Sequence, residues 1–374
     1  MRKLKITTIF GTRPEIIRLQ AIMKQIDIDF EQRIVHTGQN FDSNLSGNFF
    51  KELGIRDPDL MLNCSNESLG EFLGDLFPKI EQEFQRNRPD AILILGDTNS
   101  SLVAIQARRM AIPVYHLEAG NRSFDINVPE EINRKIVDHC SDFNLCYTEH
   151  ARRNLLTEGL HSRTISVVGS PLCEVIGNFS PKIESNNALR ENHLEASKYF
   201  LVSLHRQENV DDLNRLKQLV NSINIVADKY SLPILVSTHP RTKMKLDHAK
   251  LSLNKLVKLH EPFGFIDYLT LQKNALVVIS DSGSVSEESA ILGFPAITAR
   301  NSIERPEAIE SGVLILTGLD SDSILRGLES VINGKLAANV PSEYLITDTS
   351  NRVSRFIQST LPNYSFWSGR RIVE

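Results

Sequence analysis

Short apolar runs alternate with longer amphipathic stretches along almost the whole chain. The apolar runs are rich in Val, Ile and Leu, as is typical of strands that are buried on both faces of a parallel sheet. They cover residues 4–10, 33–37, 91–95, 113–117, 143–147, 165–168, 199–204, 233–238, 276–280, 295–299 and 313–317. Helical periodicity lies between them, for example in 69–87 and 210–229. The alternation predicts parallel strands joined by right-handed helical crossovers.

The number of predicted strands is larger than one open sheet usually contains, so we expect two sheets. The segment 169–198 is polar in its middle and rich in Asn and Pro, which is typical of a connection between domains. We therefore predict an α/β protein with two doubly wound, Rossmann-like domains, residues 1–170 and 171–350, that face each other across a cleft. Residues 351–374 are expected to form a C-terminal tail that packs back on the first domain.

The composition excludes several classes of protein. The chain is 41% hydrophobic and 24% charged, which is ordinary for a globular protein. Its net charge of −4 provides no basic field for nucleic acid or for anionic lipid. No apolar stretch is long enough for a membrane span. Because no two of the cysteines form a C-x-x-C pair, a zinc or dithiol site has no support, and we expect reduced thiols in the cytoplasm.

Polar and ionisable residues follow several of the predicted strands. In doubly wound sheets, ligands bind beyond the carboxyl ends of the strands. The relevant segments are GTRPE (11–15), GDT (96–98), EAGNR (118–122), HRQEN (205–209) and DSG (281–283). Glu118 is the least compatible with a purely structural role, because it directly continues an apolar strand, where burying a charge is costly.

The other residues each have a plainer interpretation. An Asp or Ser after a strand is often only a helix N-cap, and this applies to Asp97 and to Ser282. His205 taken singly is more often a surface or capping residue. Glu130 and Arg134 are compatible with a solvated helix face that carries an i, i+4 ion pair. The functional interpretation is favoured by the whole set, which brings carboxylates, a histidine and arginines to the strand ends of one fold.

The segment after residue 280 predicts a site for an anion. Ser282 and Gly283 lie where backbone N–H groups at the start of a helix are expected to be unpaired, and glycine allows an anion to approach the backbone. Glu288, about one turn into this helix, could accept hydrogen bonds from the two hydroxyls of a ribose. Together these features suit a nucleoside diphosphate. The usual glycine-rich loops for ATP hydrolysis and for NAD binding do not occur in the sequence.

An ordered set of motifs identifies a family. The motifs are GTRPEIIRL, HTGQNFD, GDTNS, HLEAGNR, VPEEINRKIVDH, SLHRQENV, SDSGSVSEES and ERPEAIESG. Over nearly its whole length the chain resembles the non-hydrolysing UDP-N-acetylglucosamine 2-epimerases. This resemblance implies two Rossmann-like domains of the glycosyltransferase-B type. It also implies a cytoplasmic homodimer that binds UDP and a UDP-2-acetamido sugar and needs no cofactor.

The same resemblance implies a reaction and its residues. C2 of the sugar is inverted by elimination of UDP to a 2-acetamidoglucal and re-addition of UDP, for the synthesis of bacterial surface polysaccharide precursors. The expected catalytic residues are Asp97, Glu118 and Glu130, which match the acid/base set, and His205, which would lie beside the diphosphate. Which carboxylate removes the C2 proton stays open. No metal ligand is implied, and the residues expected to bind UDP or the sugar are Arg13, Arg18, Arg134, Arg206, Phe265, Ser282, Gly283, Glu288 and Arg305.

The chain departs from the family pattern close to the expected sugar site. Arg18 stands where the family often has Lys, and Asn121 stands where it often has Leu. The segment 120–129 is also shorter than in the common enzymes and is similar to a capsule and O-antigen branch with 6-deoxy and 6-carboxylate substrates. Arg122 is the one cation in the loop 121–128, whereas Phe124 would suit a 6-deoxy sugar.

Two other functions stay open from the sequence. A glycosyltransferase of the same architecture also binds UDP-sugars, but it gives no reason for the carboxylates at positions 97, 118 and 130. A catalytically silent nucleotide-sugar-binding protein would not need those residues either. The carboxylate set therefore favours the epimerase.

Overall fold

The computed structural model describes residues 2–39, 49–204, 209, 211–238, 240–334 and 339–368. The chain forms two compact units, and each is described by itself below. Unit 1 comprises Met1–Val175 and Glu343–Glu374, and unit 2 comprises Ile176–Ser342. The boundaries expected from the sequence were residues 170 and 350. In the structure, the first division falls inside helix α7 (Leu172–Glu184), which runs without a break past residue 175.

Unit 1 contains a seven-stranded sheet in the order β3-β2-β1-β4-β5-β6-β7. All neighbouring strands are parallel. The strands are β1 (Lys5–Phe10), β2 (Glu31–His36), β3 (Leu60–Met61), β4 (Ala91–Leu95), β5 (Val114–Leu117), β6 (Phe143–Cys146) and β7 (Ile165–Val167). The order of the strands reverses between β1 and β4. This switch point is where a doubly wound sheet opens a crevice for a ligand.

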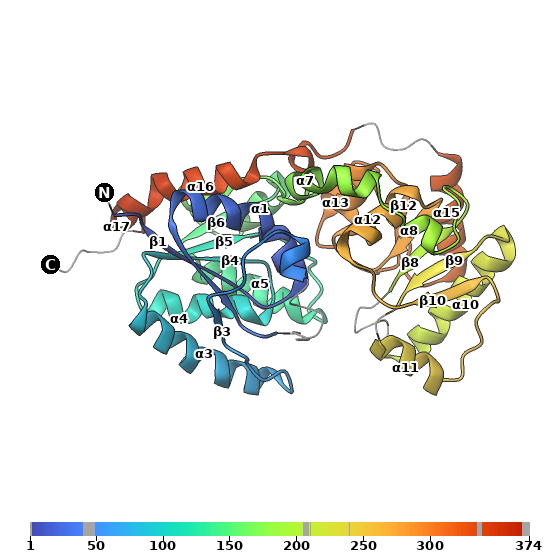
Figure 1. Ribbon diagram of the computed structural model, residues 1–374, viewed down its shortest axis with the longest axis horizontal. Coiled ribbons are helices and arrows are strands. Elements are labelled where there is room, and N and C mark those ends of the chain that lie inside the picture. Colours follow the sequence, from blue (N-terminus) through green and yellow to red (C-terminus); the bar gives the residue numbers. More distant parts are fainter. Residues whose placement is uncertain are drawn as a thin grey trace. The chain divides into compact units, whose positions relative to one another are not determined.

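The helices of unit 1 cover this sheet. They are α1 (Arg13–Asp29), α3 (Leu69–Arg86), α4 (Val103–Arg109), α5 (Pro129–Cys140), α6 (Glu149–Thr157), α16 (Thr349–Thr360) and α17 (Tyr364–Ser368). Short 3-10 turns are η1 (Asn99–Leu102), η2 (Ser162–Thr164), η3 (Ser342–Leu345) and η4 (Leu361–Asn363). Helix α16 lies along α1 (Figure 1). Its Ser354 hydroxyl donates to Asp29, and its Thr360 hydroxyl is 2.7 Å from that of Tyr115.

Unit 2 contains a six-stranded parallel sheet in the order β10-β9-β8-β11-β12-β13. Its strands are β8 (Phe200–Ser203), β9 (Ile234–Ser237), β10 (Val257–His260), β11 (Val277–Ser280), β12 (Ala296–Thr298) and β13 (Ile315–Leu316). Its helices are α8 (Ala188–Glu191), α10 (Leu213–Tyr230), α11 (Pro240–His248), α12 (Phe265–Asn274), α13 (Val285–Leu292), α14 (Pro306–Glu310) and α15 (Ser321–Asn333). The strand order reverses between β8 and β11.

The predicted fold class is confirmed, and every predicted strand is present. Two strands were missed. β3 has only two residues, and β10 alternates half-buried and exposed side chains, so neither shows a continuous apolar run. Helix α10 begins at Leu213 rather than at residue 210, because the Asp212 carboxylate accepts hydrogen bonds from the amides of Asn214 and Arg215 and so caps the helix there.

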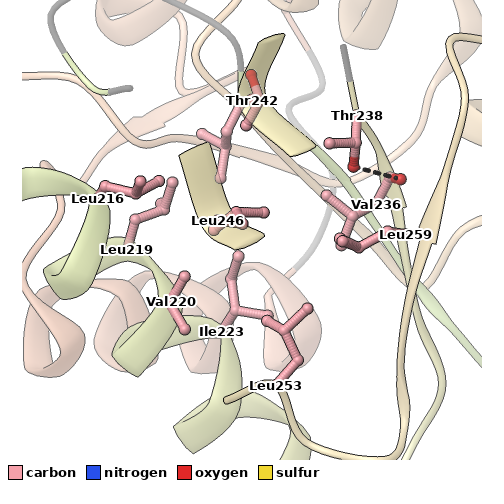
Figure 2. Close-up of a pocket in the computed structure, with 11 residues that line it drawn as sticks. Leu216, Leu219, Val220, Ile223, Val236, Thr238, Thr242, Leu246, Leu253 and Leu259 are labelled. Atoms are coloured by element: carbon pink, nitrogen blue, oxygen red, sulfur yellow. Dashed lines mark hydrogen bonds between the residues drawn. The ribbon is translucent and has the colours of Figure 1, made fainter. Parts of the chain in front are cut away.

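Unit 2 encloses a small apolar cavity of about 20 Å³ (Figure 2). Leucine, isoleucine and valine side chains from α10, α11 and the neighbouring strands line it. The hydroxyl of Thr238 at its rim donates to the Val236 carbonyl oxygen at 3.1 Å. The cavity has room for about one water molecule but offers it few polar partners, so we regard it as a packing defect.

Among the described helices, none combines the length and apolar character that crossing a bilayer requires.

Candidate active site

The turn after β5 holds Glu118 in an unusual backbone conformation. Its φ angle is +63°, in the left-handed region that residues other than glycine rarely adopt. Gly120 follows with φ of +86°, and a β-carbon at this position would lie 2.3 Å from the Ala151 carbonyl oxygen. Only glycine fits there. The turn leaves the Glu118 side chain 14% exposed at the carboxyl end of the sheet.

Both positions that depart from the family pattern contact the Glu118 carboxylate. The Asn121 side-chain amide donates to Oε1 at 3.3 Å. Nε of Arg18, on α1, is 3.8 Å from Oε2. A β-carbon at Gly96 would lie 3.8 Å from the same oxygen. The carboxylate of Glu118 is therefore beside the residue that precedes Asp97, close to the switch point between β1 and β4.

Asp97 lies on the turn after β4 and is paired with Arg134 of α5. Nη2 and Nε of the arginine are 2.6 and 2.8 Å from Oδ2 of the aspartate. Nη1 of the same arginine donates to Glu131 at 2.9 Å. Arg134 is buried, so a solvated helix face does not describe it. The structure thus brings Asp97 and Glu118 together and gives each a different arginine.

The two glutamates at the start of α5 have different environments. Glu131 is buried and accepts hydrogen bonds from the backbone N–H groups of Ser123 and Phe124, at 2.9 and 3.2 Å. Burial alone would raise the pKa of Glu131, but the bonds from Ser123 and Arg134 outweigh it, and the pKa lies below its usual value. Glu130 is half-buried, and its side chain forms no hydrogen bond or ion pair within the described ranges.

The first turn of α1 contributes two charged residues. The Arg13 guanidinium lies 4.4 Å from the ring centre of Phe49, and burial lowers its pKa. Glu15 is buried, and its carboxylate accepts hydrogen bonds from the N–H groups of Gly11 and Thr12 and from the hydroxyls of Thr12 and Thr98. Burial nevertheless raises the pKa of Glu15 to about 7. This residue was not singled out from the sequence, although the T-x-x-E capping box signals it.

In unit 2, Ser282 and Gly283 form the turn between β11 and α13. We expected unpaired N–H groups here, but that of Ser282 donates to the Ser280 hydroxyl at 3.0 Å. A β-carbon at Gly283 would lie 2.3 Å from a Glu304 carboxylate oxygen and 2.5 Å from Arg305 Nη1. Glycine is thus required for the close approach of these two side chains to the turn.

Arg305 is part of a buried cluster of alternating charges. Its Nε is 3.2 Å from the carboxylate of Glu287, and its Nη1 donates to Glu304 at 3.2 Å. The second oxygen of Glu304 is 2.8 Å from Nη1 of Arg300. All these side chains are nearly inaccessible to solvent. Pairing compensates for the cost of burying the charges and keeps Arg305 beside Gly283.

Two further predicted residues of unit 2 lie on neighbouring helices. Glu288 of α13 is buried, and its Oε2 accepts a hydrogen bond from the Gln272 side chain of α12 at 2.6 Å. Phe265 begins α12 and packs edge-on against the ring of Phe179, with ring centres 5.9 Å apart. His205 and Arg206, which the sequence also predicted, lie outside the described residues.

Fold and site together define a class. Two doubly wound parallel sheets with charged residues at the carboxyl ends of their strands form the glycosyltransferase-B type of fold. The family described as UDP-N-acetylglucosamine 2-epimerase matches residues 23–358. The chain belongs to this family, and by that membership it is an isomerase of the epimerase type. The resemblance that the motifs indicated is confirmed.

Two curated relatives and one crystal structure illustrate the similarity. The UDP-N-acetylglucosamine 2-epimerase of Methanocaldococcus jannaschii is 39% identical over 341 residues, which cover 89% of this chain and 93% of the relative. A crystal structure of the M. jannaschii UDP-GlcNAc 2-epimerase in complex with UDP-GlcNAc and UDP aligns with a TM-score of 0.89 at 38% identity, covering 95% of this chain and 100% of that one. The UDP-2,3-diacetamido-2,3-dideoxy-D-glucuronate 2-epimerase of Pseudomonas aeruginosa is 32% identical over 359 residues, with coverages of 95% and 99%.

Proposed function

We propose that this chain inverts C2 of a UDP-2-acetamido sugar without hydrolysing it. The observation that carries the proposal is the pair of carboxylates at the switch point of unit 1. Glu118 lies beside Gly96, and Asp97 follows Gly96 directly. Membership of the epimerase family supplies the reaction type.

The reaction consists of an elimination and its reversal on the opposite face. A carboxylate takes the C2 proton, the C1–O bond breaks with its electron pair leaving on UDP, and a C1=C2 double bond forms in a 2-acetamidoglucal. A proton then returns to the other face of C2, and a phosphate oxygen of UDP re-forms the bond to C1. Because nothing is oxidised or reduced overall, the chemistry requires positioned acids and bases and stabilisation of the departing diphosphate.

We assign the proton transfers to Asp97, Glu118 and Glu130. The carboxylate of Asp97 binds the Arg134 guanidinium at 2.6 Å, whereas that of Glu118 receives an amide hydrogen bond and lies 3.8 Å from a guanidinium nitrogen. Different surroundings push the pKa values of clustered carboxyls apart, which is how one group serves as base and another as acid. Arg13 and Arg18, both on α1, are assigned to the substrate's charged groups.

We assign UDP binding mainly to unit 2. The turn at Ser282 and Gly283, with Arg305 beside it, suits the diphosphate. The carboxylate of Glu288 suits the ribose hydroxyls, and Phe265 is assigned to uracil. His205 and Arg206 complete the proposed set beside the diphosphate: His205, Arg206, Phe265, Ser282, Gly283, Glu288 and Arg305.

The loop after Glu118 supports a sugar without a charge at C6. The side chain of Arg122 is fully buried, where it binds the carboxylates of Asp138 and Glu158. The side chain of Phe124 is 74% exposed. A C6 carboxylate would require a cation that this loop does not present, whereas a hydroxymethyl or a 6-deoxy methyl group suits an aromatic neighbour. We therefore propose UDP-N-acetylglucosamine or a 6-deoxy relative as the substrate.

The proposed setting follows from the substrate class. We place the enzyme in the cytoplasm, where reduced cysteines persist; all four cysteines are free thiols. We propose that the product feeds bacterial surface polysaccharides. We also propose a homodimer, to which the exposed Ile132 and Ile136, one turn apart on α5, would contribute apolar surface.

The test is proton exchange at C2. The purified chain is incubated in deuterated water with UDP-N-acetylglucosamine, its 6-deoxy analogue and a C6-carboxylate analogue, and deuterium at C2 is followed by NMR and mass spectrometry. An epimerase incorporates deuterium and forms the 2-epimer. If a glycosyltransferase or a silent binder were present instead, no sugar of the panel would gain deuterium.

A further inference from the structure

Asp138 of α5 has a fully buried carboxylate that bonds to both flanks of the Glu118 turn. Its Oδ1 is 2.9 Å from Nδ1 of His116, two residues before Glu118. Two residues after Glu118, the Gly120 N–H donates to the same carboxylate, 3.2 Å from Oδ2. Nη1 of Arg122 donates to Oδ2 at 2.7 Å. One carboxylate thus spans the chain from residue 116 to residue 122.

His116 connects this carboxylate to the neighbouring turn. Its Nε2 is 2.9 Å from the carbonyl oxygen of Gly96. A carbonyl oxygen only accepts hydrogen bonds, so Nε2 is the donor of this bond. Gly96 directly precedes Asp97. The imidazole of His116 therefore connects the turn that carries Asp97 to Asp138, which in turn binds the Glu118 turn.

The same helix reaches Asp97 directly. Arg134 lies four residues before Asp138 on α5, so both side chains project from one face of the helix. Arg134 binds the Asp97 carboxylate, and Asp138 binds the Glu118 turn. A rotation or shift of α5 would therefore move both carboxylates of the proposed site together.

The Glu118 turn requires this support. A non-glycine residue in the left-handed region is unfavourable and persists only where the surrounding structure over-determines it. The far end of the turn is also anchored, because Arg122 donates from Nε and Nη2 to Glu158 at 2.8 and 2.7 Å. The hydrogen bonds of Asp138 thus flank Glu118, the residue of this turn whose backbone conformation is unfavourable.

We propose that Asp138 and His116 are positioning residues that hold Glu118 in register with Asp97 for the reaction at C2. The inference rests on the proposed epimerase function. Neither residue is assigned a contact with the substrate: both act through the backbone of the two turns. A displacement of about 1 Å at a reacting group lowers rates by roughly 100-fold, so loss of this support should reduce turnover and leave UDP affinity unchanged.

The chain offers a matched control in Asp142. Its side chain is also buried, and its Oδ2 accepts a hydrogen bond from the N–H of Val114 at the start of β5, the opposite end of the same strand. Asp138→Asn and Asp142→Asn each remove one buried negative charge in unit 1. Only the former lies at the proposed site.

The experiment measures C2 exchange at saturating UDP-N-acetylglucosamine and UDP affinity by calorimetry. Wild type is measured first, because absence of exchange there would refute the proposed function itself. We expect Asp138→Asn to lose roughly 10- to 100-fold in turnover with UDP affinity within about twofold, while Asp142→Asn retains turnover. An equal loss in both variants, or wild-type turnover in folded Asp138→Asn, overturns the inference.

A double-mutant cycle separates positioning from general damage. If Asp138 acts through Glu118, Asp138→Asn should add almost nothing to Glu118→Gln, because the group being positioned is already gone. Multiplicative losses would refute this. Should Asp138→Asn not fold, His116→Asn serves the same cycle: it keeps a donor toward Asp138 and loses the bond to Gly96. Turnover of His116→Asn equal to wild type would then overturn the inference.

Discussion

The candidate sites of the two units use charge in opposite ways. In unit 1, arginines bind the carboxylates that we assign to chemistry, Arg134 to Asp97 and Arg18 near Glu118. In unit 2, carboxylates bind an arginine: Glu287 and Glu304 hold Arg305 beside the Gly283 turn. One unit therefore presents carboxylates paired with different side chains, and the other presents a backbone turn beside a buried cluster of paired charges.

This difference matches the separate roles, chemistry and binding, that we propose for the two sets of residues. Proton transfer needs carboxyls whose pKa values differ, which requires side-chain partners that differ from one carboxyl to the next. Binding a diphosphate and a diol needs donors and acceptors at fixed positions, which a glycine turn and a buried ion-pair cluster provide. Substitutions of the unit 1 carboxylates should therefore affect turnover, and those of the unit 2 residues assigned to UDP should affect affinity.

The largest expected effect is at Glu118. Glu118→Gln keeps the shape of the side chain but removes its proton-transfer capacity, so turnover should fall by roughly 100-fold or more. UDP affinity, measured by calorimetry, should stay within about twofold of wild type. Wild-type turnover with intact UDP binding would refute the assignment of this residue.

The stability of unit 1 should depend on pH through Glu15. The folded pKa of Glu15 is about 7, above that of an unfolded glutamate, so the folded chain binds the extra proton. The resulting stabilisation is complete below about pH 4.5 and is lost as the pH rises to about 7, on the order of 2–3 kcal/mol. Relative to Glu15→Gln, wild type should thus lose stability between pH 5 and pH 7.5.

Urea unfolding followed by tryptophan fluorescence measures this loss. The single tryptophan, Trp367, is in unit 1, with its ring centre 6.5 Å from that of Phe143. The signal therefore reports on the unit that contains Glu15. Parallel pH profiles for wild type and Glu15→Gln would show that Glu15 is already ionised at pH 5.

The next effect belongs to unit 2. Glu288→Ala should weaken UDP binding by roughly 10- to 100-fold, because hydrogen bonds to a charged group contribute about 1.5–3 kcal/mol. Turnover at saturating substrate should change little. Glu118→Gln should thus lose turnover but keep UDP affinity, and Glu288→Ala should do the opposite. Wild-type UDP affinity in Glu288→Ala, or reduced UDP affinity in Glu118→Gln, would contradict the proposed division of roles.

The smallest effect concerns sugar preference. Phe124→Ser should reduce the preference for a 6-deoxy sugar over UDP-N-acetylglucosamine by roughly tenfold, since one small apolar contact discriminates only to that extent. Ile126→Ser is the control, because Ile126 is equally apolar and 81% exposed in the same loop. Turnover of a C6-carboxylate sugar by a chain that does not exchange C2 of UDP-N-acetylglucosamine would contradict the proposed substrate class.

The predictions from sequence failed mainly where contacts are distant along the chain. The strand runs were visible because Val, Ile and Leu mark buried strands locally. The pairing of Arg134 with Asp97 was not visible, since the partners are far apart in sequence and meet only through α5. The role of Asp138 was missed for the same reason, as its partners come from β5 and the following turn.

By itself, the sequence determined the fold class and the family, and it predicted the segments to which we assign the chemistry. Local patterns are sufficient for these, because apolar runs, capping residues and ordered motifs are read over a few residues at a time. Only the tertiary structure decided which arginine binds which carboxylate, that Arg122 is buried, and that Glu118 lies beside the turn of Asp97. These features depend on strand order and helix orientation, which bring side chains from distant positions within hydrogen-bond reach and exclude water from some of them.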